Sequence, residues 1–263
     1  MPRALVLLVF FASIVAADAQ SLPPPKVEHA EPLFIDLIRD LGARKGEREW
    51  NIGFGLTDHQ RYDRYEALVE YEWAPIDRLG LEIEVPLTYF PTAANGPAPS
   101  NRVEGLKTAA QWSFLVSEKH QTSLALGYLN ELVFTDLDQV VSRPFIEGNV
   151  YNPFVVAAKR LSSQWHSLVY SGPSIEQRFG GGSHLTYELN TSVHYMVPAS
   201  RNFVGIEVNQ SWLGRDFYMT IRPQMRLQIN DQLLLGIVTG IPVRRESQRF
   251  SMFLRAIYEP KHR

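Results

Sequence analysis

The sequence predicts an all-β protein: a closed antiparallel transmembrane β-barrel of about twelve strands, preceded by a short N-terminal amphipathic helix. Three observations predict this fold. From Trp50 onward the hydrophobic period is two residues, as in strands with two different faces. Most of these segments are longer than ordinary soluble strands and match the length of a tilted transmembrane strand. Their connections alternate between short and long, which is typical of barrels with short turns at one rim and longer loops at the other.

The first residues have the features of an export signal. Arg3 precedes an apolar run, which ends in a small-residue cleavage site, Ala-Asp-Ala, at Ala19. We therefore divide the chain into a signal peptide at 1–19, a proline-rich lead-in with a helix at 20–48, and the barrel at 49–263. An uncleaved anchor is the alternative, but the apolar run is short for a helix that spans a membrane.

The predicted helix lies just before the barrel, between Pro32 and Gly42. Its apolar side chains recur at helical spacing and are Phe34, Leu37, Ile38 and Leu41. The helix could plug the lumen, cap the periplasmic mouth or rest on the membrane surface, and we favour the cap over the plug. Its polar face carries Asp36, Arg39 and Asp40, which could pair with charges in the lumen.

The alternation of apolar and polar residues predicts the individual strands. They span 50–57, 64–74, 79–89, 106–117, 121–134, 149–160, 165–175, 184–197, 202–212, 217–229, 232–241 and 249–259. Two of them, 121–134 and 149–160, alternate less cleanly than the others. Aromatic residues gather near the strand ends, as in the girdles of membrane barrels: Trp50, Trp73, Tyr89, Trp165, Tyr195, Trp212, Phe217 and Tyr258. The alternative for these aromatic residues is the core of a soluble β-sandwich.

Charged residues on the polar faces are the candidate lumen residues. Acidic ones lie on the second and third strands and basic ones on the tenth: Glu66, Glu70, Glu72, Glu82, Glu84, Arg222 and Arg226. If the first strand pairs with the last, these two groups face each other across part of the lumen. In a water-filled pore they would select solutes by charge. In a packed lumen they would instead form a buried charge network.

Composition and motifs exclude several other functions. A net charge of −2 without a basic stretch argues against a nucleic-acid partner. The chain has no cysteine, and its seven histidines have no metal-ligand spacing, so we predict no metal and no cofactor. Ser192 and His194 share a face and are the best candidates for a serine hydrolase, with His166, Ser167, Ser171 and Ser174 less well placed. Their spacing along a strand is marginal or too long for a hydrogen bond, so we predict that the protein is not an enzyme.

The two ends of the predicted barrel carry a family resemblance. The closing RFSMFLRAIYEP resembles the last strand of Gram-negative outer-membrane β-barrels, with apolar residues at alternate positions and an aromatic residue at the end: Phe250, Met252, Leu254, Ala256 and Tyr258. The tail EPKHR departs from that pattern, in which the signal ends at the chain terminus. HAEPLFIDLIRDLGARKGEREW resembles the opening of a proteobacterial family of exported barrel proteins without assigned function.

The resemblance implies a location in the cell outer membrane with both termini in the periplasm. The implied partners are outer-membrane lipid and lipopolysaccharide, the barrel assembly machinery and small solutes. The function expected from this architecture is a porin-like channel or facilitator for small solutes. A non-conducting structural or adhesive barrel, a lipid hydrolase and a soluble secreted β protein are the alternatives.

Overall fold

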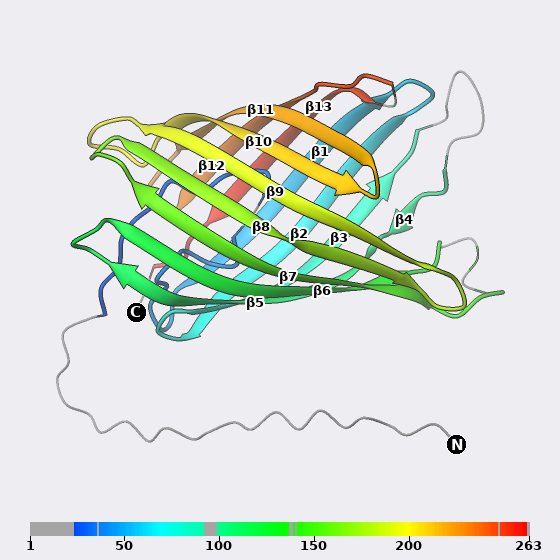
Figure 1. Ribbon diagram of the computed structural model, residues 1–263, viewed down its shortest axis with the longest axis horizontal. Coiled ribbons are helices and arrows are strands. Elements are labelled where there is room, and N and C mark those ends of the chain that lie inside the picture. The colour runs from blue at the N-terminus through cyan, green and yellow to red at the C-terminus, as the bar shows by residue number, and fades with distance from the viewer. Residues whose placement is uncertain are drawn as a thin grey trace, which may run out of the picture.

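The computed structural model describes residues 24–35, 37–91, 99–136, 139, 141–246 and 248–261. The predicted signal peptide lies outside the described residues. Within them, no helix is long and apolar enough to cross a membrane. The described chain forms a single antiparallel sheet, seen from the side in Figure 1.

Twelve long strands and one very short strand make up this sheet. They are β1 (Arg48–His59), β2 (Asp63–Ile76), β3 (Leu79–Tyr89), β4 (Arg102–Val103), β5 (Gly105–Ser117), β6 (Thr122–Phe134), β7 (Ile146–Arg160), β8 (Trp165–Arg178), β9 (Ser183–Met196), β10 (Phe203–Leu213), β11 (Asp216–Gln228), β12 (Leu233–Pro242) and β13 (Gln248–Tyr258).

The sheet closes on itself. Each long strand pairs with its neighbour in sequence, and β1 pairs with β13 along most of its length, from Trp50 opposite Tyr258 onward. The short β4 extends β5 alongside β3, where Val103 lies opposite Leu87. Because β2 also pairs with β3, the long strands form a closed ring. The predicted fold class, a closed antiparallel barrel, is confirmed.

The strand boundaries agree with the prediction to within three residues, and the largest differences are the start of β7 at Ile146 and the end of β8 at Arg178. The connections are less regular than predicted. β1 extends to His59 and β2 begins at Asp63, so this loop is shorter than the sequence indicated. The pairing of β1 with β2 continues into the polar residues that were predicted to form the loop, where Asp58 lies opposite Asp63.

The outer surface is apolar between two belts of aromatic residues. Large side chains such as Ile52, Val69 and Val85 point outward and are exposed. Aromatic pairs lie near both rims: Trp50–Tyr71 and Trp165–Tyr195 near the short turns, and Tyr65–Tyr89 and Trp212–Phe217 near the opposite rim, with ring centroids between 4.5 and 6.3 Å apart. This distribution is the one expected of a surface that faces lipid between two polar interfaces.

The prediction of an N-terminal helix that caps the barrel is wrong. Residues 24–47, called the N-terminal segment below, enter at the end where the C-terminus also lies and run inside the barrel (Figure 1). Their described part is irregular, with positive φ at Arg39 and Gly42. Leu37, Ile38 and Leu41 are buried, as a core-facing helix would require, but against the inner wall. Several of its backbone N–H groups donate to side chains of the wall.

Val69 tests which face of the wall meets lipid. It is 45% exposed on the outer surface, whereas its neighbour Glu70 is buried inside. We expect Val69→Arg to lower the free energy of unfolding in lipid vesicles by about 2–4 kcal/mol, the effect of a cation near the bilayer midplane. Glu70→Gln is the matched control and should still fold to a heat-modifiable barrel. Equal loss of folding in both variants would contradict the assignment of the faces.

Candidate functional site

The inner surface of the barrel has an acidic wall on β1, β2 and β3. We use this name for five buried carboxylates, Glu49, Glu70, Glu72, Glu82 and Glu84. Strand register places Glu70 directly opposite Glu84 and Glu72 directly opposite Glu82. Asn51 on β1 lies beside them, and its amide nitrogen is 2.7 Å from Glu70 Oε1 and 2.9 Å from Glu72 Oε1.

The next strands form an apolar wall. Its buried members come from β5 to β8 and are Ala109, Ala125, Phe154, Val156, Ala158, Leu168 and Tyr170. Leu37, Ile38 and Leu41 of the N-terminal segment pack on this wall and separate it from water. Burial of this apolar surface stabilises the segment inside the lumen.

Arginines lie on the far side of the lumen, on β11. Arg222 donates to Asn209 Oδ1 at 2.5 Å and to Ser251 Oγ at 3.1 Å, and its guanidinium lies 3.3 Å from the centre of the Phe34 ring. Arg226 donates to the carbonyl oxygen of Arg201 at 3.0 Å. Neither arginine forms an ion pair with the acidic wall within the described residues, because the N-terminal segment occupies the space between them.

The backbone of the N-terminal segment is held by side chains of the wall. The amides of Phe34 and Ile35 donate to the carboxylate of Glu207 on β10, at 3.4 and 3.1 Å. Similar bonds of 2.7–2.8 Å join the amides of four other segment residues to the wall: Ala30 to His166, Leu33 to Gln224, Arg39 to Glu72 and Gly42 to Ser113. These bonds satisfy amides that would otherwise be buried without an acceptor.

Charged side chains of the segment also pair with the wall. Arg39 forms ion pairs with Glu49 and Glu72 on the acidic wall. Asp36, predicted on the same face, lies outside the described residues. Burial alone would lower the pKa of the Lys26 ammonium, but Asp40 and Glu47, each 2.8 Å away, raise this pKa above its usual range. The bridge therefore stays ionised at neutral pH.

Two glycines allow the segment to lie against the wall. A Cβ at Gly80 would be only 2.0 Å from the carbonyl oxygen of Ile38. A Cβ at Gly236 would be 2.8 Å from the Leu33 side chain. Both positions point inward, and a side chain at either one would occupy space that the segment now fills.

A cavity of about 860 Å³ lies between the segment and the short-turn rim. Its lining includes Lys26, Asp40, Arg201, Arg226 and Glu259, so charges of both signs face the space. Arg201 and Glu259 form an ion pair near this opening. The cavity has the character of a polar vestibule that ends at the N-terminal segment.

The structure brings together four of the seven predicted lumen residues, Glu70, Glu72, Glu82 and Glu84. Glu66 shares their face but lies nearer the other rim, where it pairs with Arg64 at 2.8 Å and is 36% exposed. Arg222 and Arg226 are inward but remote from the acidic wall. The sequence analysis missed Glu207, although it lies in the inward phase of β10, and Asn51, whose role depends on register.

The serine and histidine residues considered for catalysis do not form a dyad. Ser192 Oγ is buried without a hydrogen-bond partner in the described structure, and His194 Nε2 lies 3.1 Å from Gln224 Nε2. His166 Nδ1 accepts the hydrogen bond of the Ala30 amide. His29 contacts Ser123 at 2.9 Å, but this serine is fully buried. The geometry therefore gives no support to the hydrolase alternative.

Several solved structures of outer-membrane channels and porins are similar to this chain in fold. The "COG4313 outer membrane channel from Pseudomonas putida F1" superposes with a TM-score of 0.66 at 12% identity, covering 84% of this chain and 98% of the other. The "NanC porin" gives 0.58 at 7% identity, covering 81% and 100%. The "KdgM porin" gives 0.54 at 15% identity, covering 81% and 99%. At these identities the likeness establishes the barrel fold.

The chain belongs to the HAEPLYID-like family, whose model matches residues 25–259. Residues 29–36 read HAEPLFID, so the family description corresponds to a stretch within the N-terminal segment. Comparison with curated proteins gave no match. The sequence-based resemblance to an exported barrel family is therefore confirmed.

Gly80→Ala tests whether close contact with the wall holds the segment in place. The added methyl group meets backbone, and overpacking of this kind costs about 1–3 kcal/mol. We expect trypsin to cleave the folded protein after Arg39, Arg44 or Lys45 about tenfold faster than in the unchanged protein. Gly182→Ala is the control, because a Cβ there meets nothing within 4 Å. If trypsin cleaves both variants equally slowly, close contact at Gly80 does not hold the segment in place.

Proposed function

We propose that this protein is an outer-membrane channel of the porin-like type that passes small solutes, with the N-terminal segment as a plug in its lumen. The observation that carries the proposal is a closed barrel with a charged inner surface, in which a non-sheet segment fills the path. The channels and porins with the same fold support this function.

The attachment of the plug supports a movable rather than a permanent obstruction. From Ala30 to Gly42, hydrogen bonds to individual side chains hold its backbone. Backbone hydrogen bonds to Ala74 and Arg78 join it to the barrel at its end, between Ala43 and Glu47. Each hydrogen bond to a charged side chain contributes about 1.5–3 kcal/mol. A plug held by separable contacts can shift without opening the strand ladder of the barrel.

The same proposal places the protein in the outer membrane, in contact with lipid and lipopolysaccharide after insertion by the barrel assembly machinery. The apolar outer surface and the aromatic belts support this location. Both ends of the described chain lie at one rim (Figure 1), and the two longest connections, from β3 to β5 and from β6 to β7, lie at the other. We assign the first rim to the periplasm because the long loops of such barrels are extracellular.

A non-conducting structural barrel is the second candidate. The packing of Leu37, Ile38 and Leu41 on the apolar wall favours it, because a filled lumen stabilises a barrel without any transport. The two candidates differ in one measurable property. A channel with a plug conducts more when the plug is loosened, whereas a structural barrel does not conduct.

Planar-bilayer recording of the unchanged protein and Glu207→Ala tests this difference. The substitution removes the acceptor of the Phe34 and Ile35 amides, so we expect the open fraction of the channel to rise at least about fivefold. The control is Glu188→Ala, which removes a carboxylate from the neighbouring strand β9 that makes no hydrogen bond to the described segment.

If the open fraction rises equally in Glu207→Ala and Glu188→Ala, loss of charge rather than release of the plug governs the current. Absence of current in all three proteins, each confirmed as a folded barrel by heat-modifiable gel mobility, would favour the structural barrel and end the channel proposal.

A further inference from the structure

The acidic wall holds like charges in direct opposition. Glu70 faces Glu84 and Glu72 faces Glu82 across the β2–β3 ladder, and all four are buried. Like charges at directly opposite positions disfavour strand pairing, and burial increases their repulsion. Four buried carboxylates in this arrangement persist only where positive charge or protons compensate their negative charge.

The described cations compensate only part of this wall. Arg39 pairs with Glu49 and Glu72, and the Lys107 ammonium lies 2.7 Å from Glu84 Oε1. Within the described residues, no lysine, arginine or histidine forms an ion pair with Glu70 or Glu82. Five carboxylates therefore share two close cations.

Hydrogen bonding leaves the same two residues incomplete. The Asn51 amide nitrogen lies within 3.0 Å of carboxylate oxygens of Glu49, Glu70 and Glu72, but it carries only two hydrogens. Glu70 Oε2 has no hydrogen-bond partner in the described structure, although Glu70 is only 1% exposed. Glu82, 6% exposed, likewise makes no hydrogen bond to the described residues. An unpartnered buried carboxylate oxygen is costly, so it requires either a proton or a positive ligand.

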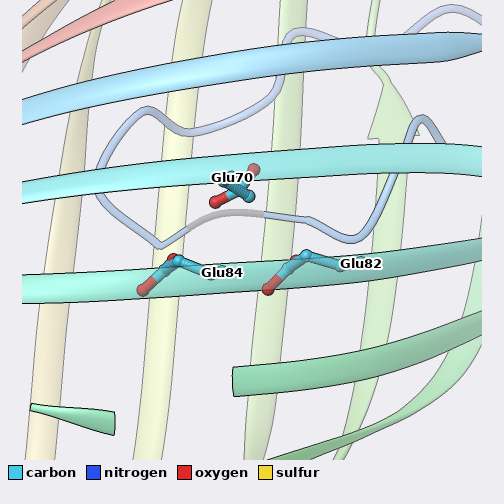
Figure 2. Close-up of side chains that lie close together, drawn as sticks. All are labelled: Glu70, Glu82 and Glu84. Carbon is cyan, nitrogen blue, oxygen red and sulfur yellow. The ribbon is translucent and has the colours of Figure 1, made fainter. Parts of the chain in front are cut away.

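The carboxylates of Glu70, Glu82 and Glu84 converge. One carboxylate oxygen from each of Glu70, Glu82 and Glu84 lies within 4.8 Å of the other two. Figure 2 shows these side chains side by side on the two strands. Because Ca²⁺ binds oxygen ligands at about 2.3–2.6 Å, one ion can bridge oxygens at this separation. Asn51 and Lys107 each hold one oxygen of Glu70 and Glu84, which orients these carboxylates.

We propose that Glu70, Glu82 and Glu84 bind one hard divalent cation, of the Ca²⁺ or Mg²⁺ class, inside the barrel. The ligands are carboxylate oxygens on two rigid strands, which suits such ions. The ammonium of Lys107 opposes the ion and limits its affinity. The site stabilises the β2–β3 pairing whether or not the barrel conducts, so it stands independently of the channel proposal.

Isothermal titration of Ca²⁺, and separately of Mg²⁺, into the full folded protein in detergent after EDTA treatment tests the proposal. We expect one ion per chain with a Kd below about 1 mM, the range of extracellular calcium modules. Glu82→Gln keeps the shape of the side chain but removes the charge of one ligand, so it should weaken binding of the ion at least about tenfold. The control is Glu66→Gln, on the same face of β2 but paired with Arg64 outside the cluster.

Glu70→Gln provides a second test if Glu82→Gln does not fold, and the thermal midpoint with and without Ca²⁺ provides a second readout. A midpoint that rises with Ca²⁺ in the unchanged protein and in Glu66→Gln, but not in Glu82→Gln or Glu70→Gln, would support the site. Two results would overturn it: no binding by the folded unchanged protein up to millimolar ion, or equal binding by Glu66→Gln and the cluster variants. The second result would place the ion on other carboxylates.

Discussion

Pairing of β1 with β13 is the interaction on which the rest of the structure depends. At membrane depth no water is available for backbone N–H and C=O groups, so a sheet that spans the membrane must close. The continuous register from Trp50 opposite Tyr258 to Asp58 opposite Phe250 provides that closure. Once the ring is closed, the two-residue period of each strand assigns every side chain to lipid or lumen. The acidic wall, the apolar wall and the aromatic belts all follow from this assignment.

Inside the ring, the N-terminal segment must satisfy its backbone groups without being part of the sheet. Its amides lie in a confined space and need acceptors, which Glu72, Glu207 and Gln224 provide from distant strands. Its apolar side chains cover a wall that would otherwise face water. Its arginine neutralises part of the acidic wall. The segment therefore completes both the packing and the charge balance of the lumen, and any displacement exposes surfaces that favour its return.

The sequence predicted most of the fold because strand alternation is a local property, visible without knowledge of partners. It failed for the segment, where the spacing of Leu37, Ile38 and Leu41 resembled a helix. There, the Arg39 and Gly42 amides, which a helix would pair internally, donate to Glu72 and Ser113, which are 33 and 71 positions away. The convergence of Glu70, Glu82 and Glu84, where no metal was predicted, arises from the β2–β3 register. Spacing along the chain does not reveal which carboxylates lie opposite each other.

The position of the segment in the chain also bears on how the barrel closes during folding. It ends at Glu47, immediately before β1 begins at Arg48, so the residues that must enter the lumen are joined to one side of the seam. Its acceptors on β8, β10 and β11 are synthesised long afterwards and approach it only as the ring curls shut. Contacts between such distant positions form slowly. Joining β1 to β13 and docking the segment therefore both depend on contacts between residues that are far apart in the chain.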